Sequence, residues 1–277
     1  MIIQHNMQAA NANRMLGSVV TSQSKSTEKL SSGYRINRAA DDAAGLSISE
    51  KMRAQIRGLN QGSTNAQDGI SLAQTAEGAL NETHAILQRM RQLAVQGANG
   101  TETSTDRQAI VTEVDQLLKE IDRIASDTEF NKMTLLDGNF DVKLHVGANE
   151  DQQIDLAIGN MSTGDDGLKL GADSTALGLK VDEQDTFNKA ITKINDAIEL
   201  VSTERGNIGA IQNRLEHTIA NVDTAAENLQ AAESRIRDVD MAEEMVTYSK
   251  NSIIQQAAQS MLAQANQSNQ GVLSLLQ

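Results

Sequence analysis

The sequence predicts a mainly α fold: a long antiparallel helical bundle or coiled-coil rod with a small β-hairpin segment, in which the N- and C-terminal helices pair. Pro is absent from all 277 residues although average usage is about 5%, so no Pro interrupts the backbone hydrogen bonding of a helix. Only 2% of residues are aromatic and there is no Trp, which is unusual for a compact globule. Apolar residues recur three and four positions apart over most of the chain, as in coiled coils.

The N-terminal stretch predicts a weakly charged helix. Arg14 is its only formal charge before Lys25. Its apolar positions lie on a lattice of threes and fours: Ile2, Ala9, Ala12, Leu16, Val19 and Leu30. Gly33 can end this helix in the left-handed conformation, and Asp41 or Asp42 can cap the next one.

Two further helices precede a change of period. A seam from Ala43 to about Gln96 predicts one long helix, and a second helix covers roughly 105 to 127. The spacing then becomes two, with Val142, Leu144 and Val146 on one run, and Ile154, Leu156 and Ile158 on the next, which predicts a β-hairpin. Residues 159–182 are rich in Gly, Asp and Ser, and we expect a loop there, with room for a short strand.

The second half of the chain mirrors the first. Helical spacing returns at Phe187 and continues to Val239, which predicts a return helix of more than 50 residues. We therefore expect a terminal coiled-coil domain made of residues 1–44 and 235–277, and a helical rod domain of residues 45–234 that carries the hairpin and loop at about 130–182.

The C-terminal tail carries no Asp, Glu, Lys or Arg after Lys250. Ile254, Ala258, Met261, Ala265, Val272 and Leu275 form its heptad seam. Interleaved Gln, Asn and Ser exclude a membrane span, because their amides and hydroxyls would be unsatisfied in hydrocarbon. Such a tail is built to contact protein, and we expect both ends to be largely disordered in the free chain and to order on association. The expected assembly residues are Ile2, Ala9, Leu16, Val19, Leu30, Ile254, Met261, Leu262, Val272, Leu275 and Leu276.

Composition and motifs exclude several functions. A net charge of −13 argues against nucleic-acid and anionic membrane partners, and the N-terminus lacks the features of a cleavable signal peptide. His5, His84, His145 and His217 are scattered without an HExxH pattern, Cys is absent, and Asp165 stands where a P-loop needs Lys. We expect no catalytic residue, metal or cofactor.

Several segments resemble bacterial flagellin, the subunit of the flagellar filament. They are "KLSSGYRINRAADDAAGLSISEKMRAQIRGL", "LQRMRQLAVQGANGT", "EIDRIASDTEFN", "LHVGAN", "NRLEHTIANV", "AAESRIRDVDMAEEMV" and the closing "MLAQANQ" and "VLSLLQ". The resemblance omits only about residues 159–182, where larger flagellins carry variable outer domains. It implies a self-assembling extracellular filament for motility, with the terminal domain forming the inner core of that filament.

The resemblance also implies partners. These are other copies of the chain, the flagellar export apparatus that passes it unfolded, an export chaperone at the C-terminal helix, and hook-associated and cap proteins. Matching flagellins are detected by a vertebrate Toll-like receptor, and Arg89, Leu93 and Glu113 stand at the matching positions. The pattern alone makes Leu93 a partly exposed residue on the flank of its helix.

Two other functions stay open from the sequence. A hook-associated protein at the junction of hook and filament shares the helical ends, but its assembly is limited. A flagellin-like enzyme would carry an inserted metalloprotease, and neither an HExxH motif nor room for an insertion between Gly159 and Asp182 is present.

Overall fold

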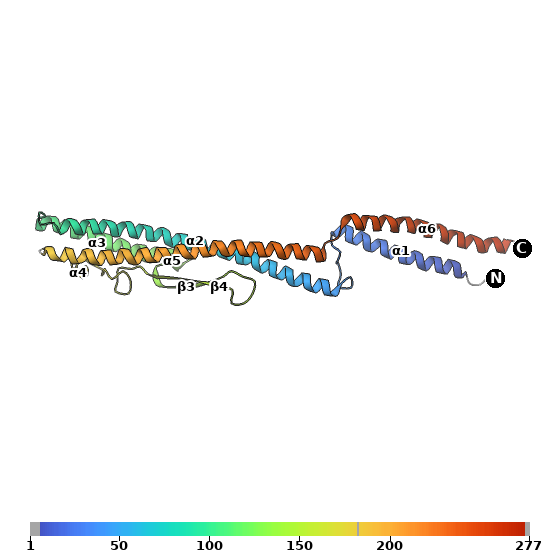
Figure 1. Ribbon diagram of the computed structural model, residues 1–277, viewed down its shortest axis with the longest axis horizontal. Coiled ribbons are helices and arrows are strands. Elements are labelled where there is room, and N and C mark those ends of the chain that lie inside the picture. Colours follow the sequence, from blue (N-terminus) through green and yellow to red (C-terminus); the bar gives the residue numbers. More distant parts are fainter. Residues whose placement is uncertain (1–5, 182, 275–277) are drawn as a thin grey trace. The chain divides into compact units, whose positions relative to one another are not determined.

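The computed structural model describes residues 6–181 and 183–274, with side chains through 267 (Figure 1). Its elements are α1 (Met7–Ser32), α2 (Ala43–Gly97), α3 (Ser104–Asp127), β1 (Glu129–Phe130), β2 (Met133–Thr134), β3 (Asp137–His145), β4 (Gln153–Asn160), α4 (Ser174–Leu177), α5 (Gln184–Arg237) and α6 (Met241–Ser274). The predicted mainly α fold, with its long helices, hairpin and paired terminal helices, is confirmed. No helix in the described ranges is long and apolar enough to cross a membrane.

The chain divides into two compact units. We call Met1–Ile56 with Glu227–Gln277 the terminal unit, and Arg57–Ala226 the central unit. The helices α2 and α5 each contribute residues to both units. The domain boundaries expected from the sequence, with their assigned roles, stay a prediction.

The central unit has a continuous apolar core. α2, α3 and α5 lie side by side in it, and one buried cluster joins them (Figure 1). Leu87, Leu118 and Phe187 are completely buried members of this cluster. α3 begins with a capping box, in which the Asp106 amide N–H bonds to the Thr103 hydroxyl and the Asp106 carboxylate accepts from the Thr103 backbone N–H.

The predicted hairpin packs against this core. Strand β3 pairs antiparallel with β4, so that Val142 lies opposite Leu156 and Leu144 opposite Ile154. Along β4, buried residues alternate with exposed ones, which is the period of two that the sequence shows. Ile154 and Leu156 are buried.

Glycines of α2 allow the hairpin to approach its backbone. A Cβ added at Gly62 would lie 2.6 Å from the carbonyl oxygen of Val146, and one at Gly58 would lie 2.8 Å from Cβ of Ala148. Glycine in a helix interior costs about 1 kcal/mol relative to Ala. The close contact explains why Gly nevertheless stands at these positions.

The segment after the hairpin differs from the expected loop. Residues 161–181 contain the short helix α4 and no strand in the described part. Two carboxylates of α3 hold this segment: Asp122 accepts from the backbone N–H of Thr163 at 2.8 Å and from its hydroxyl, and Asp115 accepts from the N–H of Ser174 at 2.7 Å. Five apolar side chains of the segment are buried: Met161, Leu168, Leu170, Leu177 and Leu179. It is a fixed part of the core.

The terminal unit consists of helices with little core. α1 and α6 run antiparallel beside each other (Figure 1), and the side-chain amide of Asn6 donates to the carbonyl oxygen of Ala265 at 3.0 Å. α1 ends at Gly33 with φ 76°, which confirms the predicted left-handed cap. Asp42 is the residue that caps α2, since its carboxylate accepts from the N–H of Gly45 at 2.8 Å.

Short connectors link the helices of the terminal unit. Tyr34 pairs with Asp238 in an isolated antiparallel bridge, and the N–H of Arg35 donates to the carbonyl oxygen of Arg237 at 2.7 Å. The guanidinium of Arg237 lies 4.6 Å from the Tyr34 ring centroid and 3.2 Å from the Glu50 carboxylate. This cluster fixes the two connectors to each other.

Candidate assembly surface

The terminal unit pairs its helices through small residues. Along α1 the half-buried face carries Ala9, Ala12, Leu16 and Val19, and along α6 it carries Ala258, Leu262 and Ala265. Alanines let two helices approach closely, but each buries little apolar area. The contact therefore holds the two helices in register without giving them a core.

Burial in the described part of the terminal unit is correspondingly small. Ile36 is its only buried apolar side chain, and every other buried apolar residue of the described chain lies in the central unit. The side chains of Ser26 and Ser49 are buried too, but they contribute little to the hydrophobic effect. A pair of helices leaves most of its surface exposed to water. In this pair the exposed surface includes many large apolar side chains.

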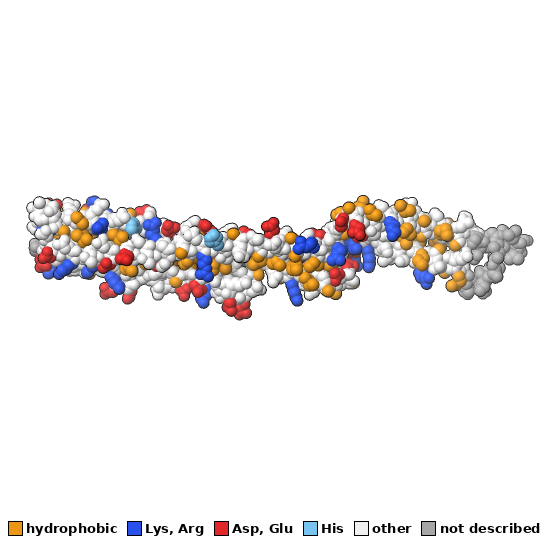
Figure 2. Space-filling view, in the orientation of Figure 1, with side chains coloured by type: hydrophobic (Ala, Val, Ile, Leu, Met, Phe, Trp, Pro, Cys, Tyr) orange, Lys and Arg blue, Asp and Glu red, His pale blue; other side chains and the backbone are white. Residues whose placement is uncertain are grey.

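Most of the large apolar side chains that are exposed belong to this unit. Among the described residues they are Met7, Met15, Val20, Tyr34, Ile48, Met241, Met245, Val246, Ile253, Ile254 and Met261. Val246 is 70% exposed, Ile253 67% and Met261 65%. Figure 2 shows apolar side chains gathered on the visible face of α1 and α6. Contiguous apolar surface on a soluble chain indicates a site of protein contact.

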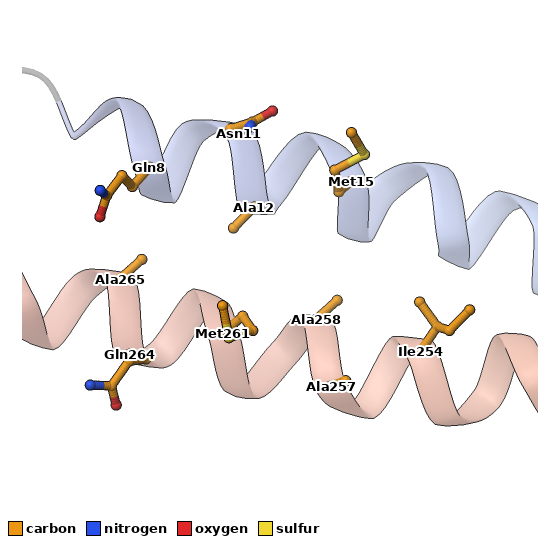
Figure 3. A pocket seen from close by; sticks show the side chains of 10 residues that line it. All are labelled: Gln8, Asn11, Ala12, Met15, Ile254, Ala257, Ala258, Met261, Gln264 and Ala265. Atoms are coloured by element: carbon orange, nitrogen blue, oxygen red, sulfur yellow. The ribbon is translucent and has the colours of Figure 1, made fainter.

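An open groove of about 610 Å³ lies between α1 and α6 (Figure 3). Ala12 and Ala258 point from one helix toward the other, and Met15, Ile254 and Met261 are the larger apolar residues of the lining. The other lining residues are Gln8, Asn11, Ala257, Gln264 and Ala265. No lining residue carries a charge, so an apolar helix could enter without burying an unpaired charge.

The predicted assembly residues fall into three groups. Ala9, Leu16, Val19, Leu30 and Leu262 are half-buried. Ile254 and Met261, predicted to share the seam with Ala258, stay exposed at the groove. Ile2, Leu275 and Leu276 lie outside the described residues, and so does the side chain of Val272. The role of all these residues in assembly stays a prediction.

The heptad seam did not predict the exposed apolar residues beside it. Met15, Val246 and Ile253 fall outside the seam, and of the three only Ile253 lies in the charge-free tail after Lys250. A two-helix pair covers one face of each helix only. Apolar residues on the remaining faces indicate further partners.

The three predicted receptor residues lie in the central unit. The guanidinium of Arg89 pairs with the Glu113 carboxylate at 2.8 Å, and both side chains are exposed. The expectation that Leu93 is partly exposed is wrong: it is 2% exposed, in the same cluster as Val114 and Phe187. α3 packs beside α2 and α5 and covers this flank, so Leu93 offers a partner almost no surface.

Two family models match most of the chain. The bacterial flagellin N-terminal helical region matches residues 3–141, and the bacterial flagellin C-terminal helical region matches residues 191–276. The first match covers all of α1, α2 and α3, and the second covers most of α5 and all described residues of α6. The groove between α1 and α6 therefore joins the two matched regions.

Curated relatives are similar over their whole length. A flagellin of Halalkalibacterium halodurans is 55% identical over 278 residues, with 100% of each chain covered. The flagellar filament 33 kDa core protein of Treponema phagedenis is 53% identical over 287 residues, again with 100% of each chain covered.

A solved structure shares the fold at low identity. A flagellar hook-associated protein from Vibrio parahaemolyticus superposes with a TM-score of 0.58 at 16% identity, covering 72% of this chain and 100% of that one. This likeness shows that the helical architecture is common to proteins with different names. The relatives that share about half of their residues with this chain are a flagellin and a flagellar filament core protein, and neither is a hook-associated protein.

Proposed function

Because the chain belongs to the bacterial flagellin family, we propose that it is the structural subunit that self-assembles into a flagellar filament for swimming motility. The chain is 53% identical to a flagellar filament core protein and 55% identical to a flagellin, in both cases over the full length of each chain. This similarity supports the proposed function over that of a hook-associated junction protein. The role is structural, without catalysis.

Assembly completes the terminal unit. The observation that carries this step is the contrast between one buried apolar side chain and a long row of exposed ones in the described part of that unit. Neighbouring copies would cover Met15, Val246, Ile253 and Met261 at once. Burying a side chain of this size contributes about 1.5–3 kcal/mol. Ordering of α1 and α6 is thereby coupled to polymerisation.

The terminal domain, residues 1–44 and 235–277, forms the inner core of the filament, and residues 45–234 form the surrounding rod. Charge-free faces support this arrangement, because an inner position desolvates every face of a helix and unpaired charges there are costly. Gln and Asn, which are frequent in α6, both donate and accept hydrogen bonds and tolerate several neighbour geometries.

The filament is extracellular and the chain reaches it unfolded through the flagellar export apparatus. An export chaperone would bind α6, whose apolar residues are exposed before assembly. Hook-associated proteins would adjoin the filament at its base, and cap proteins at its tip. The family supports these partners; their contacts on this chain are proposals.

A vertebrate Toll-like receptor would contact Arg89 and Glu113, which are exposed and paired. Arg89→Ala removes the guanidinium and leaves Glu113 unpaired. We expect receptor signalling to fall, and it is measured with a reporter cell line at matched protein concentration. Unchanged signalling would remove Arg89 from the contact.

Salting-out of the purified chain followed by negative-stain electron microscopy tests the main proposal. We expect long filaments. A junction protein with limited assembly would give short or no polymers, and this result would overturn the proposed function.

Met261→Asp tests the groove. A carboxylate at this position would be buried against neighbours in the filament, at a cost of several kcal/mol, so we expect loss of filaments with no change in the circular dichroism of the free chain. Met133→Asp is the matched control, because the same substitution then falls on an exposed methionine of the central unit. Normal filaments from Met261→Asp would place the groove outside the subunit contacts.

A further inference from the structure

The turn between α2 and α3 contains an Asn-Gly dipeptide, Asn99-Gly100, followed by Thr101. It is the only Asn-Gly sequence in the chain. All three residues are exposed and lie outside the helices. They take part in neither the buried core nor the assembly groove.

We propose that Asn99 is a site of spontaneous deamidation, a modification independent of filament assembly. The backbone nitrogen of Gly100 attacks Cγ of Asn99, a bond forms between them, and the Cγ–Nδ2 bond breaks. Ammonia leaves with the proton of the Gly100 amide. Water then opens the succinimide ring at either carbonyl and gives Asp or isoaspartate at position 99.

The side chain of Asn99 is folded across the attacking residue. Its Nδ2 donates a hydrogen bond to the Thr101 hydroxyl oxygen at 2.8 Å. Because this bond joins residues on either side of Gly100, the carboxamide lies along the Gly100 peptide. The Thr101 hydroxyl is therefore a positioning group for the reaction.

Gly100 is free to react. The neighbouring amides of Ala98 and Asn99 donate to carbonyl oxygens of α2 at 3.0 Å, whereas in the described turn the Gly100 amide has no protein acceptor. A Cβ at position 100 would meet only the side-chain amide of Gln184, at 3.9 Å. Side-chain packing does not oppose the rotation that brings the nitrogen toward Cγ, and only two long contacts to the Asn99 carbonyl oxygen, both at 3.4 Å, would have to give way.

Asparagines inside the helices are the internal comparison. Asn60, Asn81 and Asn195 lie within α2 and α5, where the next residue's amide is held by the helical hydrogen-bond ladder. An amide that is fixed in this way cannot turn toward the preceding side chain. We expect these three positions to stay intact while Asn99 converts.

Conversion would alter the corner locally. The carbonyl oxygen of Asn99 accepts from the N–H of Glu102 and from the guanidinium of Arg107, both at 3.4 Å. In the isoaspartate product the main chain runs through Cβ and Cγ, which adds one methylene group to it, and the original Asn99 carbonyl becomes part of the free α-carboxylate. The two weak contacts to Glu102 and Arg107 would therefore no longer be made to a main-chain carbonyl, and the product would carry a new negative charge.

Peptide mapping by mass spectrometry tests the proposal. The purified full chain is incubated at mildly alkaline pH beside a free peptide of residues 96–104, and Asn99→Asp supplies the Asp standard for separating the two products. We expect the mass increase of NH₂ replaced by OH at Asn99, at a rate at least equal to that in the peptide, with Asn60, Asn81 and Asn195 unchanged. Conversion slower than in the free peptide would overturn the proposal.

Two variants separate the sequence effect from the geometry. Gly100→Ala adds a Cβ that the turn has space for, and it should slow conversion severalfold in both chain and peptide because Ala has less backbone freedom. Thr101→Val keeps the side-chain shape and removes the hydroxyl, and it should slow the chain severalfold while leaving the peptide almost unchanged. Equal rates in Thr101→Val and wild-type chains would overturn the positioning role of Thr101.

Discussion

The central and terminal units are both built from long helices but reach stability by different routes. In the central unit, three helices, a hairpin and the segment around α4 enclose a buried cluster that includes Leu87, Leu118 and Phe187. In the terminal unit the described helices bury one apolar side chain, Ile36, and leave residues such as Met261 in water. A heptad pattern alone therefore does not make a core; the number of elements around it does.

The largest expected difference between the units comes from truncating an apolar side chain. Phe187→Ala removes a completely buried ring and should lower the free energy of unfolding by about 3–5 kcal/mol. Met261→Ala removes a side chain that is 65% exposed and should change it by less than about 0.5 kcal/mol in the free chain. Urea denaturation followed by circular dichroism measures both.

Similar losses from the two variants would contradict the comparison. A large loss from Met261→Ala alone would mean that the terminal helices already form a core in the free chain.

A smaller effect is expected from the glycines of α2. Gly62→Ala places a methyl group against the Val146 carbonyl and should destabilise the chain by about 1–3 kcal/mol, although Ala is the better helix former. Gly78→Ala is the control in the same helix, because no atom lies within 4 Å of its added Cβ. It should stabilise by about 0.5–1 kcal/mol. Thermal unfolding measures both variants. A midpoint temperature that rises for both of them would show that the hairpin can move away from α2.

The smallest effect is expected from two carboxylates that cap backbone turns, one in each unit. The hydrogen bond from the Thr103 hydroxyl is the main cause that lowers the pKa of Asp106, and the backbone N–H of Arg38 is the main cause that lowers the pKa of Asp41. A folded-state pKa below the unfolded value stabilises the fold fully above about pH 4, and this contribution is lost as pH falls through the lowered pKa.

Asp106→Asn should therefore destabilise the free chain at neutral pH, and the difference from wild type should shrink in acid. Asp41→Asn should have less effect on global unfolding, because its connector belongs to the unit with little core. Unfolding curves at several pH values measure both variants. A difference for Asp106→Asn that grows in acid would contradict the assigned direction of its pKa.

The sequence predicted the local elements well and their packing less completely. The caps at Gly33 and Asp42, the bounds of α2 and α5 and the hairpin follow from residue types and periods that act over a few neighbours. The short strands β1 and β2 were missed: they are joined by a turn in which Asn131 and Lys132 have positive φ, and no Gly marks it.

Long-range packing explains the remaining differences. Leu93 was expected on an exposed flank, but the period shows only which residues share a face, and α3 covers that face. We expected a loop at residues 159–182 because they are rich in Gly, Asp and Ser and their apolar residues have no regular spacing. The bonds to Asp115 and Asp122, which fix this segment, join residues more than 40 positions apart. In the groove, the split between half-buried Ala258 and exposed Met261 depends on the exact facing of two helices.

Hydrogen exchange measured on the dilute free chain and again on assembled filaments tests the central claim most directly. We expect amides of α3 to be protected in both states, and amides of α1 and α6 to exchange rapidly in the free chain and slowly in the filament. Protection of α1 and α6 in the dilute chain equal to that of α3 would contradict the claim that neighbours complete the terminal unit.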